Sequence, residues 1–226
     1  MLTEASEISS AEPARAERGA DLILSNVAVS RAGRPVLAGV SFELAPGEAI
    51  ILKGANGSGK TTLLRAVAGL LPIEDGRIEI CSDGKRLGDV DDRRRFTIHC
   101  GHADAVKAAM SARENLSFWA RLYGAPSSRI DQALETFALR PLAEARASNL
   151  SAGQRRRLGL ARLVVAGKPI WLLDEPTASM DAASSKRLVA LIEDHLRSGG
   201  SALIATHDLI DITGAKSFVL ELREAA

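Results

Sequence analysis

The chain alternates between short apolar runs and longer stretches in which hydrophobic positions repeat at helical spacing. Runs with strand character occur at residues 21–29, 36–44, 48–53, 77–81, 96–100, 170–173, 201–206 and 217–222. The run 77–81 alternates apolar and polar residues and is predicted to be an edge strand, whereas 170–173 is wholly apolar and is predicted to be buried on both faces. Because strands and helices alternate along the chain, the pattern predicts an α/β fold with a mostly parallel sheet.

The helical stretches lie at residues 60–70, 111–123, 129–138, 152–166 and 182–197. The first helix is predicted to bury one face, formed by Leu63, Leu64, Val67 and Leu70. Ser111 and Glu114 have the spacing of a capping box at the start of the second helix. Three helices follow one another without a strand between them, so residues 101–166 are predicted to form an inserted helical subdomain.

Composition favours a single globular domain, which we expect to span residues 21–226. The 226 residues are 46% hydrophobic and 25% charged, which is ordinary for such a domain. Residues 1–20 mix Glu, Ser, Ala and Arg without apolar periodicity and are predicted to be a disordered tail, not a secretion signal. Cys81 and Cys100 lack metal-site spacing and are expected to be reduced thiols. The charged cluster 91–95 is expected to be a solvated face.

Charge and hydropathy restrict the partners. The formal net charge is +1, so no nucleic-acid partner is expected. No apolar run approaches the roughly 18 residues that a membrane span requires. Any action at a membrane would therefore need a separate chain to supply the spans.

A glycine-rich loop between a predicted strand and a predicted helix carries the strongest chemical signal. It follows the phosphate-loop pattern of Gly, four residues and Gly-Lys-Thr, and consists of Gly54, Ala55, Asn56, Gly57, Ser58, Gly59, Lys60, Thr61 and Thr62. Backbone amides of such a loop, together with the N-terminus of the following helix, form an anion site. Lys60 suits β- and γ-phosphates, and the hydroxyl of Thr61 is the expected Mg²⁺ ligand.

Two adjacent carboxylates follow the apolar strand 170–173. Ligands of open α/β sheets bind at the carboxyl ends of the strands, so Asp174 is expected to hold Mg²⁺ directly or through water. Glu175 is expected to point the other way and to polarise an attacking water. The alternative is that the two acids merely cap a helix.

A second helix N-terminus suited to an anion begins at Ser151, within the segment 150–154. Serine is a favoured N-cap, and the positive end of the helix attracts phosphate. One nucleotide need not use both anion sites of the same chain. The sequence therefore suggests a nucleotide shared between two copies, each supplying one site.

Taken in order, these segments resemble the nucleotide-binding domain of ABC ATPases over residues 22–222. The motifs are the glycine loop, Leu-Ser-Ala-Gly-Gln (150–154), Leu-Leu-Asp-Glu-Pro-Thr (172–177), Ser-Met-Asp (179–181) and Thr-His-Asp (206–208). The resemblance implies a P-loop NTPase fold with an antiparallel β subdomain and an inserted helical subdomain. It also implies a head-to-tail homodimer that sandwiches ATP and Mg²⁺.

The same resemblance assigns roles to further residues. Glu175 corresponds to the catalytic base, and His207 to the histidine that contacts the γ-phosphate, with Lys60 as the third catalytic residue. Ser151, Gly153 and Gln154 would contact nucleotide in the partner copy. Asp181 corresponds to the aspartate that crosses the dimer interface.

Two departures from the family pattern stand out. Arg31 falls where the family has an aromatic residue that stacks on adenine, and a guanidinium can stack on the same face. The alternative is a solvated turn arginine. His102 falls where the family has glutamine, which suggests a role in sensing the metal or the γ-phosphate. The alternative is a structural histidine.

Within the ABC family, the chain resembles the ATP-binding subunits of the haem exporter of cytochrome c biogenesis. The features are the loop at His102, the segment 114–124 and the arginine run at 155–157. The resemblance implies a separate transmembrane permease, a place on the cytoplasmic face of the bacterial inner membrane, and haem delivery or haem-chaperone release. No haem contact is expected on this chain.

A small apolar patch is expected to receive a helix of the permease. It consists of Val106, Ala108, Ala109 and Met110, and simple packing within the insert is the alternative. Two other functions remain open: the ATPase of a transporter for another solute, and a non-transport ABC ATPase.

Overall fold

The computed structural model describes residues 19–221. Residues 1–18 of the predicted tail, and the final residues 222–226, lie outside the described part. The predicted tail is too long by at least one residue, because Ala20 is buried with 1% of its surface exposed.

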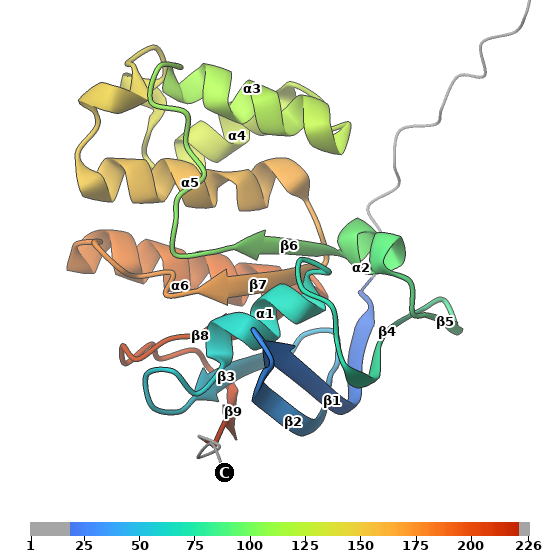
Figure 1. Cartoon of the computed structure of the whole chain (residues 1–226). Coiled ribbons are helices and arrows are strands. Elements are labelled where there is room, and N and C mark those ends of the chain that lie inside the picture. Colours follow the sequence, from blue (N-terminus) through green and yellow to red (C-terminus); the bar gives the residue numbers. More distant parts are fainter. Residues whose placement is uncertain (1–18, 222–226) are drawn as a thin grey trace, which may run out of the picture.

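A five-stranded parallel sheet forms the centre of the molecule (Figure 1). Its strand order is β6 (Thr97–Cys100), β7 (Ile170–Asp174), β8 (Ser201–Ala205), β3 (Ala49–Lys53) and β9 (Lys216–Val219). All of its pairings are parallel. Every residue of β7 is buried, as the apolar composition of residues 170–173 predicts. Every residue of β8 is buried as well.

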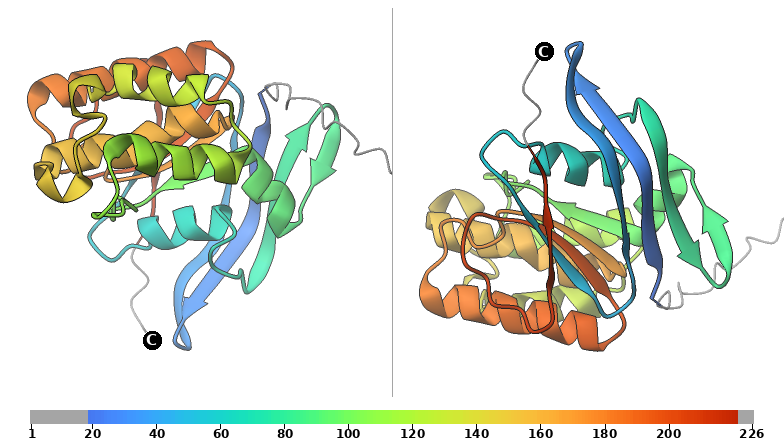
Figure 2. Two further views of the ribbon diagram at one scale, coloured as in Figure 1. Left: turned by 90° about the horizontal axis from the view of Figure 1, so that it is seen from above. Right: turned by 90° about the horizontal axis from the view of Figure 1, so that it is seen from below.

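The two faces of this sheet belong to two hydrophobic clusters. On one face Trp171 and Leu173 pack with α6 (Ala182–Arg197) and with the helices inserted between β6 and β7. On the other face Ile170 and Leu172 pack with α1 (Lys60–Val67) and the antiparallel strands. Figure 2 shows the inserted helices and α6 gathered on one side of the molecule and the antiparallel sheet on the other.

The inserted helices are α3 (Ala112–Tyr123), α4 (Ser128–Thr136) and α5 (Ala152–Ala166), with 3₁₀ turns at Arg140–Leu142 and Ala147–Asn149. The predicted capping box of α3 is present in both directions between Ser111 and Glu114. The predicted bounds of α5 and α6 agree with the structure residue for residue.

The prediction of an edge strand at 77–81 is wrong. The antiparallel sheet has the order β2 (Arg34–Leu44), β1 (Asp21–Arg31), β4 (Asp75–Ser82) and β5 (Lys85–Leu87). Asp83 and Gly84 both have positive φ, 50° and 75°, which is the backbone of a tight two-residue hairpin. The chain therefore reverses and adds β5, so that β4 is an interior strand.

The prediction of a solvated face at 91–95 is wrong for one of its residues. These residues lie in α2 (Val90–Phe96), where Arg93 is 6% exposed and donates from Nη1 to the carbonyl of Ala66 at 2.8 Å. This carbonyl near the end of α1 also accepts from the amide of Gly69 at 3.1 Å, so Arg93 adds a second hydrogen bond to it.

Leu70 is also misplaced by the helical pattern. It was predicted on the buried face of α1, but 56% of it is exposed. The helix ends at Val67, and Gly69 has a φ of 67°, which turns the chain away. Between residues 19 and 221 no helix combines the length and the apolar character of a membrane span.

Leu64 and Leu70 provide a matched pair for testing this packing. Leu64 is fully buried, so Leu64→Ala should lower the free energy of unfolding by about 2–5 kcal/mol. Leu70→Ala should change it by no more than about 0.5 kcal/mol. Urea unfolding of both variants measures the difference, and equal losses would contradict the position of Leu70.

Candidate active site

The glycine loop connects β3 to α1 and depends on residues without a side chain. Gly59 precedes α1 with a φ of 95°, and a Cβ there would lie 2.6 Å from Leu37 Cδ2. Gly54 has a φ of 146°, and a Cβ there would lie 2.5 Å from the carbonyl oxygen of Leu220. The loop can therefore adopt this compact turn at the head of α1 only with glycine at both positions.

Lys60 is folded back onto the loop that carries it. Its ammonium donates to the carbonyls of Gly54 at 2.7 Å and Ala55 at 3.1 Å, and the residue is only 9% exposed. Ser58 Oγ is buried and has no hydrogen-bond partner among the described residues. The loop thus holds an ammonium and an unused hydroxyl at the place where an anion is expected.

A cavity of about 630 Å³ opens over the loop. Most of the residues that we singled out from the sequence line it, and three further ones, Ala32, Arg34 and Val36, join them. The predicted lining residues are Arg31, Asn56, Gly57, Ser58, Gly59, Lys60, Thr61, Thr62, His102, Asp174 and Glu175. Segments from four distant parts of the chain therefore meet at one cavity.

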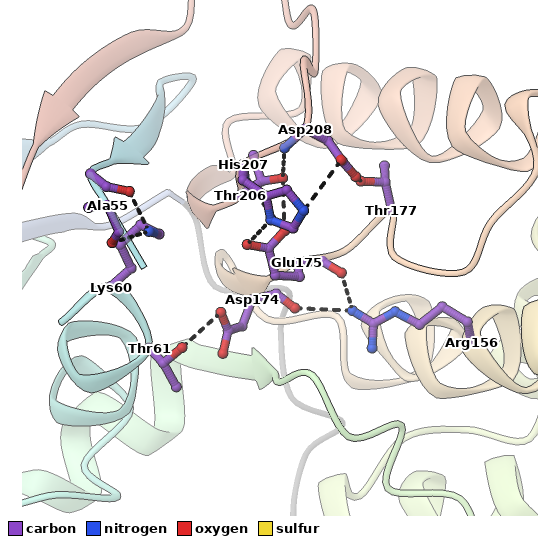
Figure 3. Close-up of polar contacts among 11 residues, drawn as sticks. Ala55, Lys60, Thr61, Arg156, Asp174, Glu175, Thr177, Thr206, His207 and Asp208 are labelled. Atoms are coloured by element: carbon purple, nitrogen blue, oxygen red, sulfur yellow. Dashed lines mark hydrogen bonds and ion pairs between the residues drawn. The ribbon is translucent and has the colours of Figure 1, made fainter. Parts of the chain in front are cut away.

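Asp174 and Thr61 supply adjacent oxygens in this cavity. Thr61 Oγ1 donates to Asp174 Oδ1 at 3.2 Å, and Asp174 is 4% exposed (Figure 3). Hydroxyl and carboxylate oxygens are the ligand types that Mg²⁺ prefers. The pair fits the metal site that the sequence predicts.

Glu175 points to a different set of partners. Its Oε1 lies 2.9 Å from Nδ1 of His207, and its Oε2 accepts from Thr206 Oγ1 at 3.1 Å (Figure 3). The hydrogen bond to this carboxylate, together with its negative charge, raises the pKa of His207. The two neighbouring acids thus have different partners: Asp174 contacts Thr61, whereas Glu175 contacts Thr206 and His207.

The second group of candidate residues does not line this cavity. Ser151 and Gln154 form a capping box at the start of α5, with Ser151 Oγ accepting from the amide of Gln154 at 3.2 Å. Gly153 lies against residue 179, where a Cβ would be 3.1 Å from the carbonyl of Ser179. Asp181 is the N-cap of α6 and accepts from the amide of Ser184 at 2.6 Å. Within one copy, the two anion sites remain apart.

The sequence reasoning missed Arg156. This residue is 3% exposed and contacts the backbone of both Asp174 and Glu175. A signal was present, because Arg156 lies four and seven residues before the buried Leu160 and Leu163, on the inward face of α5. An arginine on a buried helical face needs polar partners.

Comparison with known proteins identifies the family of this chain. A family model described as ABC transporter matches residues 37–178. The chain is 50% identical over 186 residues to the cytochrome c biogenesis ATP-binding export protein CcmA of Ruegeria pomeroyi, covering 82% of this chain and 84% of that protein. The protein of the same name from Cereibacter sphaeroides is 48% identical over 202 residues, covering 89% of each.

Solved structures agree on the fold. An ATP-binding subunit of an ABC transporter matches with a TM-score of 0.74 at 23% identity, over 83% of this chain and 80% of that one. An ATP-binding protein from Pyrococcus furiosus matches with a TM-score of 0.75 at 25% identity, over 88% of this chain and 97% of that one.

The parallel sheet, the phosphate loop and the acids at the strand end define an ATPase of the ABC class, whose domain binds ATP. The chain belongs to the ABC transporter family and, within it, to the cytochrome c biogenesis ATP-binding export proteins. The predictions of fold class and family are confirmed.

The histidines offer a test of the site's electrostatics. His207 should titrate with a pKa above 6.5 because the carboxylate of Glu175 favours its charged form. Burial lowers the pKa of both His99 and His195 to about 4. NMR titration of the histidine ring signals should therefore separate His207 from these two, and Glu175→Gln should lower the pKa of His207.

The sign of the pH effect on stability follows from the raised pKa. The folded state holds the proton of His207 more tightly than the unfolded state, so the pair stabilises the fold fully below pH 6.5. This contribution is lost as the pH rises through the raised pKa. A pKa of His207 that does not respond to Glu175→Gln would contradict the contact.

Proposed function

We propose that this protein is the ATP-hydrolysing subunit of the haem exporter of cytochrome c biogenesis, and that it drives haem delivery or haem-chaperone release through a separate membrane subunit. The chemistry rests on one arrangement at the edge of the parallel sheet. There Thr61 is hydrogen-bonded to Asp174, and His207 is hydrogen-bonded to Glu175. The biological assignment rests on the similarity to the cytochrome c biogenesis export proteins.

In this proposal the cavity holds ATP with its phosphates over the glycine loop. The loop amides and Lys60 bind the β- and γ-phosphates, and Thr61 and Asp174 hold Mg²⁺. When bound, Mg²⁺ neutralises phosphate charge as it develops. Glu175 accepts a proton from the attacking water, and His207, held by that carboxylate, contacts the γ-phosphate.

A second copy completes the site. Ser151, Gly153 and Gln154 lie outside the cavity of their own chain, at the N-terminus of α5, where the positive end of the helix favours an anion. We therefore assign these residues to the nucleotide of the partner copy, with Asp181 at the interface between the two. ATP binding then closes a head-to-tail homodimer, and hydrolysis removes the bridging γ-phosphate.

We also assign roles to Arg31 and His102, the two cavity residues that depart from the family pattern. Arg31 and His102 both line the cavity. Arg31 is exposed at the end of β1 and is free to stack on adenine. His102 stands where the family has a glutamine, and we assign to it the same role of sensing the metal or the γ-phosphate.

The membrane subunit is expected to contact the loop that follows His102. Ala108 and Ala109 are exposed there, and Val106 and Met110 are half-buried. Such a site would place the protein on the cytoplasmic face of the bacterial inner membrane as a peripheral subunit.

The role of Glu175 is tested by Glu175→Gln. The variant should hydrolyse ATP at least about 10²-fold more slowly, because an amide cannot accept the proton. Its affinity for a fluorescent ATP analogue should change by less than about threefold, since the glycine loop is intact. Single-turnover hydrolysis and equilibrium binding measure the two quantities.

Glu193→Gln is the matched control for that experiment. Glu193 lies on α6, outside the cavity, and accepts hydrogen bonds from the amide and the hydroxyl of Thr213. Its substitution should leave the hydrolysis rate unchanged. A normal rate in Glu175→Gln would contradict the assignment of the base.

The transport assignment is tested by capturing the closed dimer. The Glu175→Gln protein with ATP and Mg²⁺ should recover a multi-span membrane protein and cytochrome c maturation components from detergent-solubilised membranes. The Lys60→Ala variant, which cannot hold the phosphates, serves as the control and should recover neither. Recovery of ribosomes, or of an unrelated permease, would overturn the exporter assignment and leave the ATPase assignment intact.

A further inference from the structure

Arg156 is a buried charge with an unusually complete set of partners. Its side chain is 4% exposed, and all three of its nitrogens donate hydrogen bonds. It lies on α5, five residues after Ser151, and reaches away from that helix toward the acids of the cavity (Figure 3). A guanidinium is taken out of water at a high cost unless its donors are paired. The hydrogen bonds of Arg156 are therefore required to compensate for the burial of its charge in the folded protein.

One side of the guanidinium holds the turn that carries Glu175. Nη2 donates to the carbonyls of Asp174 at 3.1 Å and Glu175 at 2.7 Å, and Nε donates to that of Pro176 at 3.4 Å. Glu175 has a φ of 48°, a left-handed conformation that is uncommon for residues with a Cβ. It also precedes a proline, a position that favours extended backbone. The bonds from Arg156 stabilise a turn that the local sequence disfavours.

The other side of the guanidinium holds the loop of His102. Nη1 donates to the carbonyls of Gly101 at 2.9 Å and His102 at 3.3 Å, and to Asp104 Oδ1 at 3.0 Å. The loop also rests directly on α5, because a Cβ on Gly159 would lie 2.7 Å from the carbonyl of Asp104. One side chain thus connects the turn of Glu175 to the loop of His102.

We propose that Arg156 is a positioning residue for hydrolysis, which holds the carboxylate of Glu175 and the loop of His102 in a fixed relation to each other and to the N-terminus of α5. It touches neither nucleotide nor metal in this role and acts through the backbone of the turn. The proposal rests on the proposed function, since it requires Glu175 to be the base. It predicts that loss of Arg156 slows hydrolysis while the glycine loop still binds nucleotide.

Arg157 provides a matched control on the same helix. It is half-buried and donates from Nη1 to the carbonyls of Phe137 at 3.0 Å and Ala138 at 3.4 Å, within the helical insert. Arg157→Met removes the same charge and a similar kind of contact, but it leaves the turn of Glu175 untouched. Arg156→Met and Arg157→Met should both lower the melting temperature.

The experiment compares single-turnover ATP hydrolysis of the full chain at saturating nucleotide. Arg156→Met should be slower by about 30-fold or more, with the Kd of a fluorescent ATP analogue changed by less than about threefold. Arg157→Met should stay within about threefold of the unmodified protein. In a Glu175→Gln background, adding Arg156→Met should slow hydrolysis by less than about threefold, because the two residues act through one group.

Arg156→Lys is the second variant, for use if Arg156→Met does not fold. A lysine ammonium has three donors and cannot reach carbonyls on both sides, so an intermediate loss of rate is expected with unchanged nucleotide affinity. A rate equal to that of Arg157→Met, for either variant, would overturn the proposal, and so would a full additional loss in the Glu175→Gln background. A normal rate in Glu175→Gln alone would overturn the assignment of the base, and this proposal with it.

Discussion

The register of three parallel strands determines where the glycine loop, the two acids and the Thr206–His207 segment lie. Leu52 of β3 pairs with Ala205 of β8, and Ala205 pairs with Asp174 of β7. The three strands therefore end in one row, although they come from distant parts of the chain. The glycine loop, the pair of acids and the Thr206–His207 segment each begin within a residue or two of that row. A shift in register of one strand would turn its polar residues to a different face and separate the two hydrogen-bonded pairs of the site.

The parts of the site that depend on local spacing were predictable from the sequence. The strand, loop and helix around Lys60 follow from a nine-residue pattern, the capping box of α3 follows from two residues three apart, and the N-cap of α5 follows from Ser151. The parts that depend on a distant carbonyl were not predictable. Arg93 is buried because the carbonyl of Ala66 accepts from it, and no pattern within residues 91–95 reveals that partner. The short strand β5 was missed for a related reason, since three residues of a polar stretch carry too weak a pattern to be recognised.

The buried arginines of α5 connect the helical insert to the parallel sheet. Arg162 reaches from α5 to strand β6, where it donates from Nη2 to the carbonyl of His99 at 2.9 Å, and it lies over the ring of Trp119. Arginine suits such places because its planar fork can reach several acceptors at once and keeps its charge. The helical insert and the parallel sheet are thus joined by polar side chains as well as by the apolar cluster around Leu173.

The internal contacts of Lys60 have a consequence for how tightly any phosphate can bind. Two of the three N–H donors of the ammonium are used by the carbonyls of Gly54 and Ala55. An anion over the loop therefore shares the ammonium with two backbone acceptors or replaces one of them. The measured affinity is then a difference between two sets of bonds, and it understates the strength of the contact that forms. The same two bonds fix the ammonium against the loop, so the fold itself sets the position of this charge.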